Sequence, residues 1–291
     1  QSVTCVPMTV KRVGIVGSGI MGTGIAECAA KNGYEVVVRS RRQETADSVV
    51  TSLEKSLAKQ VDKGKLSEEE RAAALSRVTA TSDLGELSEC DLVIESIVED
   101  LTAKKHLFNE LDRICHDGTI LATNTSTLPV IELAMETGRP EKVCGVHFFN
   151  PAAVMTLVEI VRPLTASDET IAECRTFAES CGKQPVEVKD QAGFIVNALL
   201  FPYLNNAVRL LESGVASQED IDAAMKGGCG FPMGPFALLD LVGLDTSLAI
   251  LDALYDEFRD PNYAPVPLLR RMVSAERLGR KSGRGFYDYH R

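Results

Sequence analysis

The chain of 291 residues lacks several features that mark particular classes of protein. It has no apolar run long enough to cross a bilayer, so we expect no membrane-spanning segment. Its 31 basic residues are outnumbered by 41 acidic ones, and a net charge of -10 disfavours binding to nucleic acid or anionic lipid. Any anionic ligand must therefore be held by a local basic site.

Paired cysteines are also lacking. The eight cysteines are scattered, and no two form a CxxC pair of the kind found in zinc sites and redox motifs. We therefore predict no metal site and no disulfide framework, and we expect reduced thiols in a cytoplasmic protein. Residues 1–10 carry no signal-peptide pattern and are predicted to be a loose N-terminal extension.

Short apolar runs alternate with helical patterns through the first two-thirds of the chain. Such runs are typical of strands buried on both faces, as in a parallel sheet. Helical segments such as Ser67–Ser76 and Lys104–Arg113 lie between them. The alternation predicts a doubly wound α/β domain over residues 11–189. The predicted strands are Lys11–Val16, Glu35–Arg39, Asp91–Ser96, Thr119–Ala122, Val143–His147, Leu157–Val161 and Gln184–Val188.

From residue 190 onward the strand signal all but disappears. Gln191–Ser213 is one long helical stretch, and further helical pieces begin at Ser217 and Pro235. Glycine-rich breaks separate these pieces. We therefore predict that residues 190–291 form a second, smaller, all-α domain.

The first predicted strand leads directly into the glycine-rich segment GSGIMG. A lone GxGxxG also occurs in tight strand-to-helix turns that bind nothing. Here an apolar strand precedes it and a helix follows, which is the context of a dinucleotide site in a Rossmann-type domain. The helix N-terminus offers free N–H groups to the phosphates. The predicted contacts are Gly17, Ser18, Gly19, Ile20, Met21 and Gly22.

The end of the second predicted strand bears on the choice between NAD and NADP. Domains that bind NAD usually have an acidic residue there, which bonds the ribose 2′-hydroxyl. This chain has Ser40, with Arg39, Arg41 and Arg42 around it. A solvated basic turn is one interpretation. Because guanidinium groups bind phosphate well, we instead predict that Ser40, Arg41 and Arg42 contact the cofactor and that NADP is accepted.

A local basic face occurs in and just after Val49–Val61. At helical spacing Ser52, Lys55, Lys59 and Lys63 share one face, and leucines share the opposite one. An ordinary surface helix with solvated lysines would show this pattern. So would a binding face for a long anionic substrate, such as a nucleotide-tailed thioester.

One of only four histidines, His147, ends a predicted strand in VCGVHFFNP, at the sheet edge where doubly wound domains bind ligands. Further on, Glu159 lies within the apolar run LVEIV, where an unpaired carboxylate is costly. Each could be structural, His147 as a hydrogen-bonded histidine and Glu159 in a salt bridge. Together they are typical of a catalytic base and the acid that orients it.

Two further polar segments could belong to this site. NTSTL, Asn124–Leu128, follows a buried strand; it could cap a helix or place the Ser126 hydroxyl in the ligand crevice. Asn197 lies in the apolar segment GFIVNALL. It could form a buried bond between helices or face the cleft.

Together these segments resemble the L-3-hydroxyacyl-CoA dehydrogenase family, in its short bacterial 3-hydroxybutyryl-CoA dehydrogenase form. The resemblance covers nearly the whole chain after the N-terminal extension. Seven separated blocks carry it in the family's order: GSGIMGTGIA, ESIVED, NTSTL, GVHFFNPAAVMTLVEIV, GFIVNALL, GGCGFPMGPFALLDLVGLD and KSGRGFYDY.

The resemblance implies hydride transfer between NAD(P) and a 3-hydroxyacyl-CoA, giving a 3-ketoacyl-CoA, in fatty acid or butanoate metabolism. It implies that His147 exchanges the hydroxyl proton, that Glu159 orients His147, and that Ser126 and Asn197 bond the substrate's reacting oxygens. Implied cofactor contacts also include Glu99, Lys104, Asn124, Ser126 and Asn150. Implied substrate contacts also include His147, Asn150 and, for coenzyme A on a helical arm, Ser52 and Lys59.

Ser40 departs from the family, whose members commonly have Asp there, and this leaves the choice of NAD or NADP open. Two other functions also stay open. One is a related dehydrogenase of a sugar acid or other hydroxy acid; the other is a non-catalytic, crystallin-like protein that binds the cofactor. The lysine face favours a coenzyme A ester, and the four polar site residues favour an enzyme. The resemblance further implies a homodimer joined through the C-terminal domain.

Overall fold

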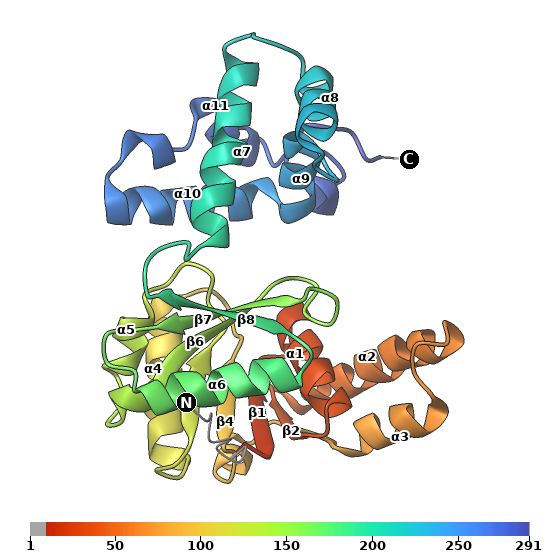
Figure 1. Cartoon of the computed structure of the whole chain (residues 1–291), viewed down its shortest axis with the longest axis vertical. Coiled ribbons are helices and arrows are strands. Elements are labelled where there is room, and N and C mark those ends of the chain that lie inside the picture. Colours follow the sequence, from red (N-terminus) through yellow and green to blue (C-terminus); the bar gives the residue numbers. More distant parts are fainter. Residues whose placement is uncertain (1–9, 291) are drawn as a thin grey trace, which may run out of the picture. The chain divides into compact units, whose positions relative to one another are not determined.

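The computed structural model describes residues 10–290, which divide into two compact units (Figure 1). The first unit ends at Asp190, and the second begins at Gln191. An α/β unit followed by a helical one confirms the predicted fold class. The predicted extension, 1–10, lies outside the described residues except for Val10, which is buried in the core of the first unit.

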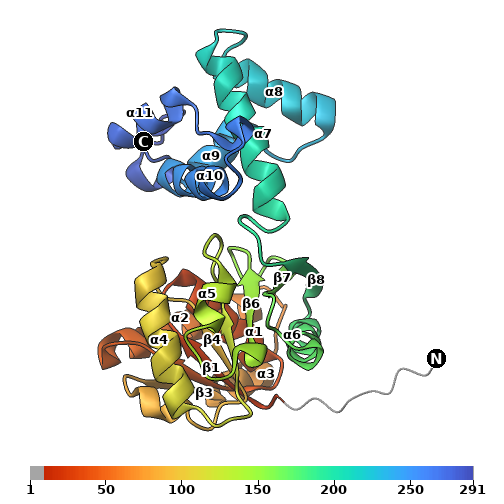
Figure 2. The same ribbon diagram turned by 90° about the vertical axis from the view of Figure 1, so that its left-hand side faces the viewer.

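The first unit is built on an eight-stranded sheet in the order β3-β2-β1-β4-β5-β6-β7-β8. Figure 2 shows α4 and α5 on one face and α1 and α6 on the other. The strand order reverses between β1 and β4, which is where doubly wound sheets open a crevice for ligands. The strands are β1 Arg12–Val16, β2 Glu35–Arg39, β3 Val78–Thr81, β4 Leu92–Glu95, β5 Ile120–Thr123, β6 Val143–Phe148, β7 Leu157–Arg162 and β8 Gln184–Lys189.

Two features of the sheet differ from expectation. The strand β3 was not predicted, because VTAT is a short edge segment that is only partly buried and has no continuous apolar run. Strand β7 runs antiparallel to β6, whereas the apolar runs suggested a parallel sheet. The connection from Phe148 to Leu157 is too short for the crossover that parallel neighbours need, so the chain returns alongside β6.

The helices α3, α4 and α6 of the first unit begin at side-chain caps. Ser67 forms a capping box with Glu70 at the start of α3, and Asp100 accepts from the Ala103 N–H at the start of α4. The helices α2 and α3 pack on each other and form the predicted helical arm (Figure 1), and α2 also packs against β3. The helices are α1 Ile20–Lys31, α2 Gln43–Asp62, α3 Glu68–Ser76, α4 Leu101–Ile114, α5 Val130–Ala134 and α6 Asp168–Ser180.

The second unit is helical and packs around its own apolar core, in which Phe236, Leu251 and Leu254 are fully buried. Its first helix starts later than the predicted Gln191–Ser213, because Gly193 and Phe194 take positive φ angles of 72° and 48°. The helices are α7 Val196–Glu212, α8 Gln218–Cys229, α9 Pro235–Val242, α10 Leu244–Phe258 and α11 Pro267–Ser274. No helix within residues 10–290 is long and apolar enough to span a bilayer.

Candidate active site

The glycine-rich turn lies between β1 and α1, at the carboxyl edge of the sheet. A Cβ atom added to Gly17, whose φ is 128°, would lie 2.2 Å from the Ser96 carbonyl oxygen. One added to Gly22 would lie 2.1 Å from the carbonyl oxygen of Gly17. Beside Gly19, by contrast, a Cβ atom would meet nothing within 4 Å. Gly17 and Gly22 thus allow tight packing, and Gly19 leaves open space at the helix N-terminus, as a pyrophosphate requires.

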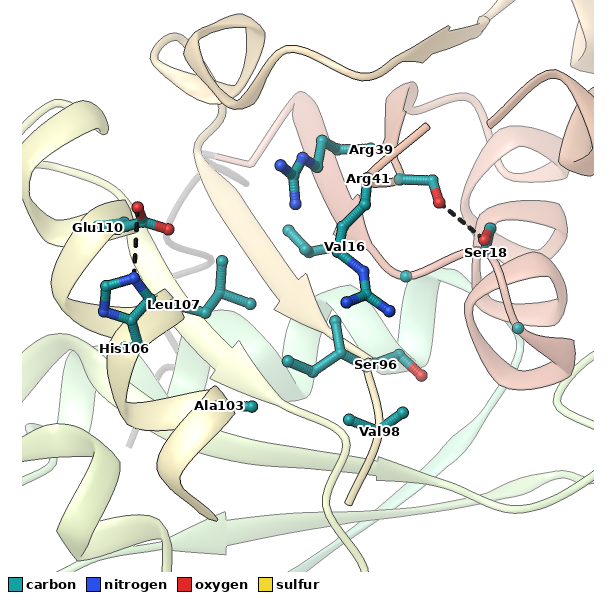
Figure 3. A pocket seen from close by; sticks show the side chains of 14 residues that line it. Val16, Ser18, Arg39, Arg41, Ser96, Val98, Ala103, His106, Leu107 and Glu110 are labelled. Carbon is teal, nitrogen blue, oxygen red and sulfur yellow. Dashed lines mark hydrogen bonds and ion pairs between the residues drawn. The ribbon is translucent and has the colours of Figure 1, made fainter. Parts of the chain in front are cut away.

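A cavity of about 590 Å³ opens beside this turn (Figure 3). Its walls come from the glycine turn, the end of β2, the segment after β4, and α4, where His106 Nε2 lies 3.7 Å from Glu110 Oε1. It therefore has room for the nucleoside part of a dinucleotide. The lining residues are Val16, Gly17, Ser18, Gly19, Arg39, Ser40, Arg41, Ser96, Ile97, Val98, Ala103, His106, Leu107 and Glu110.

Ser40 lies in the wall of this cavity and is only 9% exposed. Its Oγ atom is 2.9 Å from Ser18 Oγ, so the glycine turn and the end of β2 share a hydrogen bond. Arg39 and Arg41 line the cavity as well, whereas Arg42 directly precedes α2 and is exposed to solvent. Arg39, which was not a predicted contact, therefore lines the cavity. The predicted contact Arg42 does not line it.

The second cluster lies at the carboxyl end of β6. His147 and Glu159 are directly opposite in the antiparallel β6–β7 pair, so their side chains share one face of the sheet. His147 Nδ1 is 2.8 Å from Glu159 Oε2, and the residues are 3% and 1% exposed. On its other side, His147 Nε2 is 3.0 Å from Ser126 Oγ. The ring of Phe149 packs against the imidazole, with centroids 4.6 Å apart.

This arrangement assigns separate tasks to the two imidazole nitrogens. A carboxylate can only accept hydrogen bonds, so Glu159 selects the tautomer with the proton on Nδ1. Nε2 then presents its lone pair, which can accept a proton from a hydroxyl group, as a general base must. The structure therefore brings together three of the predicted catalytic residues, Ser126, His147 and Glu159.

The loop that carries Ser126 is fastened at several points. Asn124 Oδ1 accepts from the Phe148 N–H at 2.8 Å, which ties the loop to β6. Glu99 accepts from the Ser126 N–H at 3.0 Å and from the Thr125 hydroxyl. Burial disfavours ionisation of Glu99, but the Lys104 ammonium and these donors outweigh it and lower the pKa of the carboxyl below its usual 4.5.

Lys104 is buried beneath this loop, and its ammonium is already paired. It lies 2.7 Å from Glu95 Oε1 and 3.1 Å from Glu99 Oε2. Glu95 was not predicted as a site residue. It ends the apolar strand segment LVIE, where, as for Glu159, an unpaired carboxylate would be costly.

The basic face of the arm has the predicted orientation. Leu53 and Leu57 are each 1% exposed in the core, while Lys55 and Lys59 face solvent. Ser52 is on the exposed face, and its hydroxyl donates to the carbonyl oxygen of Ser48. One hydroxyl group and two ammonium groups, those of Ser52, Lys55 and Lys59, are therefore exposed on α2.

Two further predicted residues lie on other segments of the chain. Asn150 follows β6 and is exposed, and it precedes Pro151 through a cis peptide bond. Asn197 is in the first turn of α7, in the second unit, where it is 8% exposed. Their contacts with ligands stay predictions. Within residues 10–290, no three His, Cys, Asp or Glu side chains cluster in a way that could hold a metal ion.

Comparison with known proteins gives one consistent result. The family model of the 3-hydroxyacyl-CoA dehydrogenase NAD binding domain matches residues 12–191, and that of the C-terminal domain matches residues 193–289. The chain belongs to the 3-hydroxyacyl-CoA dehydrogenase family. The first match covers the unit that contains both the glycine turn and the histidine cluster, so this family's NAD binding domain is the setting for the site described above.

Relatives from two organisms support this family assignment. A 3-hydroxybutyryl-CoA dehydrogenase of Mycobacterium tuberculosis is 48% identical over 286 residues, covering 96% of this chain and 99% of the relative. The crystal structure of M. tuberculosis FadB2 superposes with a TM-score of 0.94 at 48% identity, covering 97% and 99% of the two chains. The (S)-3-hydroxybutyryl-CoA dehydrogenase PaaH1 of Ralstonia eutropha gives a TM-score of 0.95 at 42% identity, covering 97% and 100%.

Proposed function

We propose that the protein interconverts (S)-3-hydroxybutyryl-CoA and acetoacetyl-CoA, as the names of its relatives in the 3-hydroxyacyl-CoA dehydrogenase family suggest. The observation that carries the proposal is the hydrogen-bonded series Ser126–His147–Glu159 at the ligand edge of a dinucleotide-binding sheet. A structural histidine would not require a buried carboxylate behind it and a hydroxyl before it, at the edge where ligands bind.

The chain's own residues manage the proton. His147 Nε2 takes the proton of the 3-hydroxyl group during oxidation and returns it during reduction. Glu159 holds the imidazole in the required tautomer and stabilises the imidazolium that forms. Ser126, which bonds His147, hydrogen-bonds the reacting oxygen, and Asn197 is proposed as its second partner. A bound nicotinamide dinucleotide supplies the hydride chemistry.

The remaining contacts serve to hold the two ligands. The glycine turn, Gly17–Gly22, is proposed to bind the pyrophosphate, and Glu99, Asn124 and Asn150 are proposed to contact the nicotinamide end of the dinucleotide. Ser52 and Lys59 on α2 hold the phosphate-bearing end of coenzyme A. Their exposure on a basic face of an acidic protein supports this role.

The assay that tests this function measures the reduction of acetoacetyl-CoA through the fall in absorbance of NADH or NADPH as it is oxidised. Turnover of acetoacetyl-CoA but not of free acetoacetate or a sugar acid is expected, because only the thioester has a tail for the α2 face. His147→Gln should lower kcat by about 10²–10⁴-fold, the usual contribution of general acid–base catalysis. Turnover of the sugar acid alone would favour the related-dehydrogenase function. Absence of any turnover would favour the non-catalytic one.

NADP acceptance is proposed as the distinguishing feature of this chain. Ser40 replaces the acidic residue that would repel a 2′-phosphate, and the guanidinium groups of Arg39 and Arg41 line the same cavity. One arginine–phosphate bond contributes about 1.5–3 kcal/mol, or roughly ten- to a hundredfold in affinity. We expect a lower KM for NADPH than for NADH, reversed by Ser40→Asp. A strong preference of the unaltered enzyme for NADH would contradict this assignment.

A cytoplasmic homodimer joined through the second unit is proposed as well. Leu199, Phe231 and Leu241 of that unit are 72%, 41% and 50% exposed, which an interface would cover. The seven cysteines within the described residues are free thiols, as suits a reducing compartment. Sedimentation should give twice the chain mass, and Leu241→Glu should lower it.

A further inference from the structure

A buried ion pair beneath the loop of Ser126 has no part in the proton chemistry described above. The Lys104 ammonium lies between two carboxylates, 2.7 Å from Glu95 Oε1 and 3.1 Å from Glu99 Oε2. The side chains of Glu95 and Lys104 are 0% and 1% exposed. A single charge at that depth would be costly, so each of these two residues requires the other.

Glu95 also connects two strands to the loop. It ends β4 and is in register with Thr123, which ends β5. Glu95 Oε2 accepts from the Thr123 hydroxyl at 2.7 Å, and that hydroxyl accepts from the Thr125 N–H at 3.2 Å. Glu95 Oε1 accepts from the Ile97 N–H at 2.7 Å. One buried carboxylate thus links β4, β5, α4 and the start of the loop.

From Lys104 the contacts continue to the reacting histidine. Glu99 Oε2 pairs with Lys104, and Glu99 Oε1 accepts from the Ser126 N–H at 3.0 Å. Ser126 Oγ in turn lies 3.0 Å from His147 Nε2. An unbroken series of polar contacts therefore runs from Glu95, which lies in the interior, to His147.

We propose that Glu95 is a positioning residue that holds Ser126 against His147, acting through Lys104 and Glu99. It touches no reacting atom, and its role rests on the function proposed for His147. Without the charge of Glu95, Glu99 is the one counter-ion left to the buried ammonium within residues 10–290, and the ammonium draws that carboxylate away from the Ser126 N–H. The loop then loses the hydrogen bond that fixes the position of the Ser126 hydroxyl relative to His147 Nε2.

The test compares two variants that alter opposite ends of the same region. Glu95→Gln keeps the shape of the side chain and removes its charge. Asp190→Asn is the control, because Asp190 accepts from the N–H groups of Val130 and Ile131 at the start of α5, just after the loop, at 3.0 and 2.7 Å. We expect Glu95→Gln to lower kcat about ten- to a hundredfold with little change in the KM for acetoacetyl-CoA. Asp190→Asn should retain the kcat of the unaltered enzyme. Equal kcat values in the two variants would overturn the proposal.

A second measurement does not depend on turnover. Imidazole signals of the four histidines can be followed by ¹⁵N NMR, with His147 assigned by the signal that His147→Gln removes. Glu95→Gln should shift the His147 Nε2 resonance, and Asp190→Asn should not. An unchanged resonance in Glu95→Gln would overturn the positioning role. A shifted resonance in a protein that does not reduce acetoacetyl-CoA would support that role and reject the proposed function instead.

The variant Thr123→Val covers the case in which Glu95→Gln fails to fold. It leaves the Glu95–Lys104 pair charged and removes the hydroxyl that holds Glu95 Oε2. A smaller shift of the His147 resonance and a smaller fall in kcat, both in the same direction, are expected. Values equal to those of the unaltered protein would count against the proposal.

Discussion

Replacement of Glu159 by glutamine tests the catalytic assignment most directly. Glutamine has nearly the same shape, and its carbonyl oxygen can still accept from His147 Nδ1, 2.8 Å away in the structure. The variant loses the negative charge and, because an amide can donate as well as accept, no longer enforces the Nδ1–H tautomer as a carboxylate does. A hydrogen bond to a charged group contributes about 1.5–3 kcal/mol, against about 0.5–1.5 kcal/mol for a neutral one. The difference, about 1–1.5 kcal/mol, corresponds to a fall in kcat of at least roughly 5- to 13-fold.

The assay is single-turnover reduction of acetoacetyl-CoA, which separates the chemical step from product release. Glu159→Gln should lie between the unaltered enzyme and His147→Gln, and its rate should depend on pH in a different way from that of the unaltered enzyme. Circular dichroism should show that the variant folds, since a buried charge is removed and no cavity is made. A rate and a pH profile that match the unaltered enzyme would refute the pairing of Glu159 with a catalytic His147.

Four further predictions concern other parts of the first unit. Gly22→Ala should lower the free energy of unfolding by about 1–3 kcal/mol in urea titrations, because its Cβ would lie 2.1 Å from a backbone oxygen. Gly19→Ala should keep its stability and weaken binding of the dinucleotide, since its Cβ would fill only open space. Lys59→Ala should raise the KM for acetoacetyl-CoA with little change in kcat. The control is Lys11→Ala, which removes another exposed lysine and should leave this KM unchanged. The lowered pKa of Glu99 stabilises the fold above the usual 4.5 and ceases to do so as the pH falls through the lowered value. The stability difference between the unaltered protein and Glu99→Gln should therefore shrink as urea titrations move from neutral to acidic pH.

Prediction from the sequence succeeds where a signal is local. The predicted Glu35–Arg39 coincides with β2, and Ser67–Ser76 with α3 and its cap. Continuous apolar runs and capping residues carry this information within a few positions. The edge strand β3, Val78–Thr81, lacks such a run, because only one neighbouring strand and partial burial define it.

Site residues follow the same rule. His147 and Glu159 stand out because a polar side chain in an apolar run demands a partner. Glu95 is likewise a polar residue in an apolar run, LVIE. Its partner Lys104, however, lies on the following helix, in a sequence whose charged residues resemble those of a surface helix. A lysine in a helical pattern usually faces solvent, and its burial becomes apparent only when α4 is packed on the sheet.

The order of residues by itself determined the two-unit architecture, the glycine turn and the identity of the chemical groups at the sheet edge. Only the tertiary structure decided that β7 returns antiparallel to β6, which sets Glu159 opposite His147. It also decided that Arg39 rather than Arg42 lines the cavity, and that Glu95, Lys104 and Glu99 join beneath Ser126. The physical reason is that strand pairing and charge burial depend on contacts between segments far apart in the chain, whose energies no local pattern records.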